Sequence, residues 1–225
     1  MQSLEIGFSN PRHDQGLRGD ELQELLAVGA YAIPSFVRAC GGLSAVKICV
    51  RSQDLASDCR GNRNWSRLVL LSMIENVLHE CTPLLRSLEI RLPLTRDFEA
   101  LNQYVIKAPV LLNIISRLED LDIAIDDASG PGSFRYSHSP ESDDHRDFPN
   151  RHHEDGFWHF VQLTTALKTL FVSGTHVLNL DMLPDVCTGT LQELYLTRVE
   201  VSCSRLEDLV GCDIVGLRAI QFWCV

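Results

Sequence analysis

A short recurring phrase, L-x-x-φ-x-φ with φ a large apolar residue, constrains the fold of this chain more than any other feature. Six copies begin at Leu43, Leu85, Leu118, Leu167, Leu191 and Leu217. The last two intervals between these starts are 24 and 26 residues, inside the leucine-rich-repeat period of about 20–29. The earlier intervals are 42, 33 and 49 residues, which predicts long helices or insertions in those units. Met1-x-x-Leu4-x-Ile6 also fits, so the chain is expected to begin in mid-solenoid.

Between the phrases the apolar period changes from 2 to about 3.6, the pattern of alternating strands and helices. Helices are expected at residues 20–40, 66–81, 96–107, 157–166 and 203–212. The first should be kinked or broken at Pro34. The sequence therefore predicts an irregular α/β leucine-rich-repeat-like solenoid, with a parallel strand row on its concave side and helices on its convex side. The alternative is an ordinary α/β domain with a doubly wound sheet.

One continuous solenoid domain with three parts is expected. Residues 1–125 are interpreted as irregular repeats with long helices, and residues 157–225 as more regular repeats. Residues 126–156 carry eight acidic and three basic residues and almost no large apolar ones. Such a segment buries too little apolar surface to offset the entropy of ordering it, so a disordered acidic, His-rich loop insertion is predicted.

Charge and composition limit the partners. The net charge of −10 argues against nucleic acid as a partner, because phosphate binding needs clustered Lys and Arg. No apolar run spans a bilayer and no secretory signal is visible, which favours a cytoplasmic or nuclear protein without a membrane partner. The eight cysteines form no CxxC pair and are interpreted as buried, reduced thiols.

No residue set nominates a catalytic, cofactor or metal site. His152-His153-Glu154-Asp155, with His138, His145, Asp143 and Asp144 nearby, is the sharpest metal candidate, but it lies in the predicted loop without a fixed frame. Ser139-Pro140 in the same loop is a candidate proline-directed phosphorylation site. Nucleophile-elbow and glycine-rich phosphate motifs do not occur. The chain is therefore interpreted as a non-enzyme without cofactors; the alternative is a small α/β enzyme with no recognisable motif.

The predicted strands place alternate side chains on the concave side. The central outward row would contain Lys47, Glu89, Asp122, Phe171, Tyr195 and Gln221. The row beside it would contain Cys49, Arg91, Ala124, Ser173, Thr197 and Trp223. Phe171 and Tyr195 should be neighbours with Trp223 nearby, and exposed aromatics are enriched at binding hot spots. The protein-binding residues predicted on this surface are Glu89, Arg91, Asp122, Phe171, Tyr195, Gln221 and Trp223; the alternative is that another part of the protein covers the aromatics.

The segment LQELYLTRVEVSCSRLEDLVGCDIVGLRAIQFWCV, residues 191–225, resembles the leucine-rich-repeat region of filamentous-fungal F-box-like proteins. In that family a strand phrase is followed by a valine-rich strand end, a Ser-capped helix and another phrase ending near an aromatic residue. The resemblance implies a ubiquitin-ligase substrate receptor, whose F-box recruits the ligase adaptor while the repeats hold the target protein. No F-box is visible in this sequence, so only the target-binding half is carried over, and a ligase adaptor is a partner only if an F-box lies outside this chain.

Overall fold

The fold is known from a computed structural model. It describes residues 3–8, 19–50, 63–80, 84–92, 95–125, 154–174, 177–185, 189–211 and 217–223. Six helices cover much of this part of the chain: α1 (Gly19–Cys40), α3 (Arg63–Glu80), α4 (Thr95–Lys107), α5 (Pro109–Ser116), α7 (Glu154–Gln162) and α9 (Cys203–Gly211). A short 3₁₀ helix, η2, spans Leu180–Met182.

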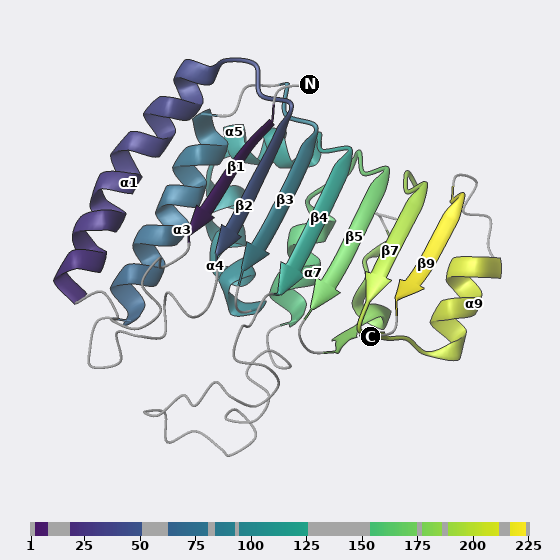
Figure 1. Cartoon of the computed structure of the whole chain (residues 1–225). Coiled ribbons are helices and arrows are strands. Elements are labelled where there is room, and N and C mark those ends of the chain that lie inside the picture. The colour runs from purple at the N-terminus through teal and green to yellow at the C-terminus, as the bar shows by residue number, and fades with distance from the viewer. Residues whose placement is uncertain are drawn as a thin grey trace, which may run out of the picture.

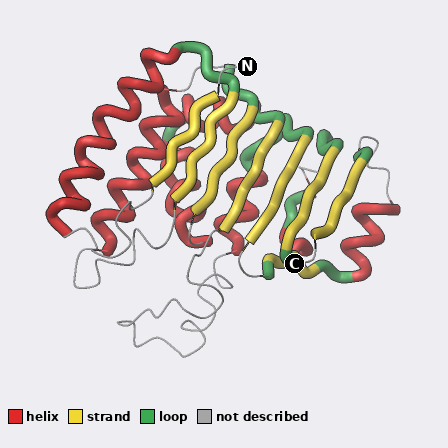
Figure 2. The backbone as a smooth tube through the Cα atoms, in the orientation of Figure 1, coloured by secondary structure: helices red, strands yellow, loops and turns green. Residues whose placement is uncertain are grey.

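One parallel sheet organises the molecule (Figure 1). Its seven strands are β1 (Ser3–Phe8), β2 (Ala45–Val50), β3 (Ser87–Leu92), β4 (Asp120–Ile125), β5 (Thr169–Gly174), β7 (Glu193–Thr197) and β9 (Ala219–Trp223). They lie side by side in the order in which they occur along the chain. A doubly wound sheet has a strand order that reverses and helices on both faces. Here the order does not reverse, and the described helices lie on one side of the sheet (Figure 2), so the doubly wound alternative is wrong. A separate pair, β6 (Leu178–Asn179) and β8 (Val199–Glu200), is also parallel.

Every predicted phrase overlaps one strand of this sheet. The two φ residues of each phrase occupy matching positions on neighbouring strands, as in the pairs Leu88 with Leu121 and Ile90 with Ile123. The same register aligns Leu4 and Ile6 of β1 with Val46 and Ile48 of β2, as the last two positions of the additional phrase predict; its first position, Met1, lies outside the described residues. Alternation along a strand sends these apolar side chains to the helix side, where all are buried except Leu4 of β1 and Ile220 and Phe222 of β9.

Successive strands also begin with the same backbone hydrogen-bonding pattern. The backbone carbonyl of the residue before one strand accepts hydrogen bonds from two successive N–H groups at the start of the next strand. Five carbonyls do this in succession, at donor–acceptor distances of 2.7–3.2 Å, and they belong to Ser44, Arg86, Glu119, Lys168 and Gln192. This contact fixes the register at one end of the sheet, because each strand start is tied to the preceding one.

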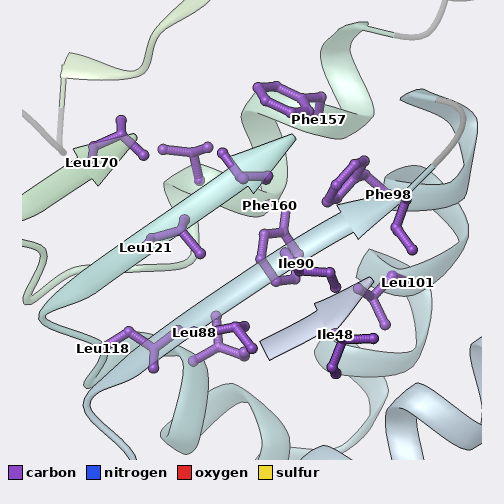
Figure 3. Packing of buried hydrophobic residues seen from close by; sticks show 14 of the residues in the cluster. Ile48, Leu88, Ile90, Phe98, Leu101, Leu118, Leu121, Phe157, Phe160 and Leu170 are labelled. Atoms are coloured by element: carbon purple, nitrogen blue, oxygen red, sulfur yellow. The ribbon is translucent and has the colours of Figure 1, made fainter. Parts of the chain in front are cut away.

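The hydrophobic core lies between the sheet and the helices (Figure 3). Phe98 of α4 contacts Phe157 and Phe160 of α7 edge-on, with ring centroids 5.2 and 5.8 Å apart. Helices α4 and α7 approach closely because Gly156 has no side chain; a Cβ there would lie 2.7 Å from Glu99 Cβ. Asn102 Nδ2 donates to the Gly156 carbonyl at 2.7 Å, which satisfies a polar group inside this contact.

Several expected helix limits differ from the structure. Helix α1 continues through Pro34, so the predicted break is absent. Helix α5 was not expected; Pro109 at its start suits a first helical turn, where an N–H has no intrahelical partner. Helix α7 begins at Glu154, three residues earlier than expected, so residues 154–156 belong to a helix rather than to the acidic insertion. The rest of that insertion, 126–153, lies outside the described residues.

The final phrase departs from the buried pattern. Ile220 and Phe222 of β9 occupy the helix-side positions of the register, opposite Leu194 and Leu196. Ile220 is only partly buried, and Phe222 is 44% exposed, although φ residues were expected to face the core. Among the described residues, β9 is the last strand at its edge of the sheet, so it has a packing neighbour on one side only.

Candidate functional site on the open face of the sheet

The side of the sheet opposite the helices is called the open face here, and its side chains form aligned rows. The central row is, in strand order, Glu5, Lys47, Glu89, Asp122, Phe171, Tyr195 and Gln221. This confirms the predicted alignment and adds Glu5. In the second predicted row, Cys49, Arg91, Ala124 and Ser173 are successive partners, and Thr197 pairs with Trp223. Ala124 is buried, unlike the other members of this row.

Strands β1, β2 and β3 carry charged side chains on the open face, and their open-face positions are called the ionic half. Lys47 Nζ lies 3.4 Å from Glu5 Oε1 and 3.3 Å from Glu89 Oε1. Arg91 Nε donates to Glu89 Oε1 at 2.6 Å. Two carboxylates, Glu5 and Glu89, therefore face two cations, Lys47 and Arg91, and the formal charge of the ionic half is zero.

The charged forms of both cations are favoured in the ionic half. The hydrogen bond and charge of Glu89 raise the pKa of Lys47. Burial opposes the charge of Arg91, but its hydrogen bond to Glu89 and the nearby carboxylates outweigh burial and raise its pKa. Cys49 lies beside this network, and burial raises the pKa of its thiol, which keeps it protonated.

The open-face positions of β4, β5, β7 and β9 are called the aromatic half. The rings of Phe171 and Tyr195 stack with centroids 4.1 Å apart and planes within 7° of parallel. Phe171 is 41% exposed, and Trp223 is 58% exposed. Tyr195 Oη donates to Glu193 Oε2 at 3.0 Å. The predicted aromatic neighbours are therefore in contact, and the described residues leave much of Phe171 and Trp223 uncovered.

The aromatic half is acidic. Its ionisable side chains, in a count that omits Tyr195, are the carboxylates of Asp120, Asp122 and Glu193, and the formal charge is −3. Asp122 receives a hydrogen bond from Arg91 Nη2 at 3.3 Å across the boundary with the ionic half. Burial nevertheless raises the pKa of the Asp122 carboxyl, and the charge of Arg91 only partly offsets this. Burial thus disfavours the charged form of Asp122, whereas the charged forms of Lys47 and Arg91 are favoured.

Sequence reasoning missed a second charged row, which lies where the strands begin. Arg86 Nε lies 3.3 Å from Glu119 Oε1, and Lys168 Nζ contacts Glu119 Oε2. These three residues follow the first Leu of successive phrases, at Leu85, Leu118 and Leu167. The alternation of charge at that one phrase position was the available signal. These ion pairs connect adjacent strand starts and are partly exposed, so each is expected to contribute little to stability.

Most residues of the predicted metal candidate lie outside the described part of the chain, and one described cysteine is not buried. His138, His145, His152 and His153 lie outside the described residues, as do Ser139, Asp143 and Asp144. Glu154 is buried at the start of α7, where its Oε2 accepts a hydrogen bond from the Asn179 N–H at 2.9 Å. In the part of the chain that is described, no group of three or more His, Cys, Asp or Glu residues is placed to hold a metal ion. Cys203 is exposed, so the expectation of buried thiols is wrong there.

Comparison with known proteins adds no relative. No protein-family model, curated protein or solved structure matches the chain. Across the described helices, none combines the length and apolar character that crossing a membrane requires. The described residues thus form a mixed α/β fold with a seven-stranded parallel sheet, and the open face of that sheet carries the candidate site.

Proposed function

We propose that this chain is a leucine-rich-repeat-like solenoid that binds another protein on its open face. Three observations support the solenoid interpretation. One phrase recurs at each strand of the seven-stranded sheet, the strands follow in chain order, and five successive strand starts share one backbone contact. Units of this kind bury their apolar face only by stacking on their neighbours, which is how repeat proteins build a core and an extended binding surface.

The observation that carries the binding proposal is the aromatic group of the open face, in which Phe171 and Trp223 are exposed and Tyr195 is half-buried. Large aromatic side chains dominate the energetics of protein interfaces. Here they lie on the face opposite the helices, where packing of the core does not require them. Glu89, Arg91, Asp122 and Gln221 would form the polar surroundings of this contact.

The resemblance of residues 191–225 to fungal F-box-like proteins extends the proposal to a cellular role. The chain would then be the substrate-binding repeat region of a ubiquitin-ligase receptor. The open face would hold the protein to be ubiquitinated, and an F-box would be needed to recruit the ligase adaptor.

Site-specific photo-crosslinking tests the binding proposal. A photo-reactive amino acid replaces Gln221 on the open face or, as a control, the exposed Val28 on α1. Each protein is irradiated in a lysate of the source organism, and adducts are identified by mass spectrometry. We expect a discrete protein adduct from position 221 that is absent from position 28. Replacing Phe171 and Tyr195 together by Ala should abolish it, whereas Glu5→Gln in the ionic half should not.

Circular dichroism and thermal unfolding of each variant establish that it is folded before crosslinking. Equal adducts from both positions, or an adduct that survives loss of Phe171 and Tyr195, would contradict a binding site in the aromatic half.

A further inference from the structure

Each ring of the stacked pair has one face that the other ring does not cover. Phe171 and Tyr195 come from neighbouring strands at matching register, and their rings are nearly parallel. Each ring therefore covers one face of the other. The remaining face of Phe171 is turned toward β4, and that of Tyr195 toward β9. A flat group that stacks on Phe171 would meet Asp122, which is the register partner of Phe171 on β4.

The charge around this ring favours a cation. Asp122, Asp120 and Glu193 are the carboxylates of the aromatic half, and Arg91, a cation of β3, pairs with Asp122 among them. Arg91 is shared, because its Nε donates to Glu89 at 2.6 Å while its Nη2 lies 3.3 Å from Asp122. The raised pKa of Asp122 is consistent with an incompletely compensated carboxylate. A further cation beside Asp122 would stabilise its charge.

Arginine fits this combination better than other side chains. Its guanidinium is planar, stacks on aromatic rings, and donates several hydrogen bonds to a carboxylate in a fixed geometry. Lysine supplies the charge without the flat surface. The formal charge of −3 on the aromatic half disfavours acidic segments and phosphates as ligands.

We infer that the aromatic half binds a basic segment of a partner protein, with an arginine guanidinium stacked on Phe171 and paired with Asp122. This inference rests on the proposed protein-binding function and specifies the chemistry of the partner. Trp223 and the outer face of Tyr195 provide additional apolar surface for residues that flank the arginine.

Titration of the full chain with model peptides tests the inference. The probe is a Gly- and Ser-based decapeptide with two arginines, compared with versions in which both are lysine or citrulline. Binding is followed by NMR through the ring signals of Phe171 and Tyr195. We expect the arginine peptide to bind at least about tenfold more tightly than the citrulline peptide and about threefold more tightly than the lysine peptide, since stacking and charge both contribute.

The variants localise the site. Phe171→Leu keeps an apolar side chain but removes the ring, and it should lower the affinity for the arginine peptide at least about fivefold. Asp122→Asn should also weaken binding of the arginine peptide, and it should reduce the ratio of its affinity to that of the citrulline peptide. Glu5→Gln, which removes an exposed carboxylate of the ionic half, should change the affinity less than about twofold.

Failure of this inference is distinguishable from failure of the proposed function. Equal binding of the arginine, lysine and citrulline peptides, or shifts confined to the ionic half, would overturn the arginine site. If position 221 still gave an adduct that depended on Phe171 and Tyr195, the protein-binding proposal would stand without it. Loss of that adduct together with absence of peptide binding would contradict both the protein-binding proposal and the arginine site.

Discussion

The ionic half and the aromatic half of the open face share one backbone and differ in what they display. Both are built from parallel strands in continuous register. In the ionic half the central row reads Glu5, Lys47 and Glu89, whose charges pair with one another and with Arg91. In the aromatic half the same row contains a stacked pair of rings and one carboxylate, Asp122, whose ion-pair partner Arg91 belongs to the ionic half. The repeated phrase therefore determines the sheet, while the residues between its apolar positions determine the surface.

The difference suggests a division of roles. Exposed ion pairs contribute little to stability, and a self-paired row leaves few charges for a partner. Exposed aromatics gain from being covered by a partner, and the carboxylates of the aromatic half gain when that partner supplies a cation. We therefore expect mutations of the core to affect both halves alike, and mutations of the open face to separate them.

The largest expected effect is in the shared core. Leu88 beneath the ionic half and Leu194 beneath the aromatic half are fully buried at the same phrase position, and replacing either by Ala should lower the free energy of unfolding by about 2–5 kcal/mol. Ile220→Ala, at that position in β9, should cost only about 1 kcal/mol because its side chain is partly exposed. Urea denaturation at one pH measures all three. A mild effect of Leu194→Ala, similar to that of Ile220→Ala, would show that the two halves do not share one continuous core.

Next in size is the effect of the open face on partner binding. Replacing Phe171 by Ala should weaken binding of the crosslinked partner by about 2 kcal/mol, the usual scale of an interface hot spot. Lys47→Ala, at the same row position in the ionic half, should change the affinity by less than about 0.5 kcal/mol if the partner covers the aromatic half alone. Calorimetric titration of the purified partner provides both values. Equal losses for the two variants would mean that the partner spans the whole open face.

Much of this architecture could be predicted because the phrase contains two independent signals. The first Leu and the alternating apolar positions identified six strands of the seven-stranded sheet, the phrase beginning at Met1 indicated β1, and the phrase positions aligned the central row. Contact between Phe171 and Tyr195 followed from that alignment and from the distance between adjacent strands.

Other features depend on tertiary contacts that the pattern does not contain. Helix α5 was not predicted, because its eight residues directly follow α4 and a proline inside an apolar segment does not by itself mark a helix start. Glu154 looked like part of a polar loop, although it is buried against the Asn179 N–H contributed by a segment 25 residues away. The exposure of Phe222 reflects its place on the edge strand, since its phrase is otherwise like the buried ones. The split of the open face into balanced and acidic halves became visible only when the registers were known.

A smaller effect should appear in the pH dependence of stability. The pKa of Asp122 is raised by burial above the ordinary value of about 3.9. The folded protein therefore binds this proton more readily than the unfolded chain, and lowering the pH through the raised pKa should stabilise the wild type relative to Asp122→Asn. Glu119→Gln is the control of opposite sign: the contact with Lys168 lowers the pKa of Glu119, so the wild type should lose its advantage over this variant as the pH falls.

Urea denaturation between neutral pH and about pH 4 measures these two differences. If the advantage of the wild type over Asp122→Asn instead decreased on acidification, the Asp122 charge would already be well compensated by Arg91. The aromatic half would then resemble the ionic half electrostatically.

The smallest expected effect concerns Tyr195 and decides which carboxylate remains available to a ligand. Glu193 accepts the hydrogen bond of the Tyr195 hydroxyl and, through that bond, raises its pKa above the ordinary value of about 10. The ultraviolet titration of tyrosinate, taken as the difference between wild type and Tyr195→Phe, should show this, and Glu193→Gln should bring the pKa back down. Phe171→Leu should leave most of the shift, since the hydrogen bond remains. An unshifted Tyr195 would mean that Glu193 is not held by the hydroxyl; an incoming arginine could then pair with Glu193 on the β7 side, and the preference for Asp122 would be lost.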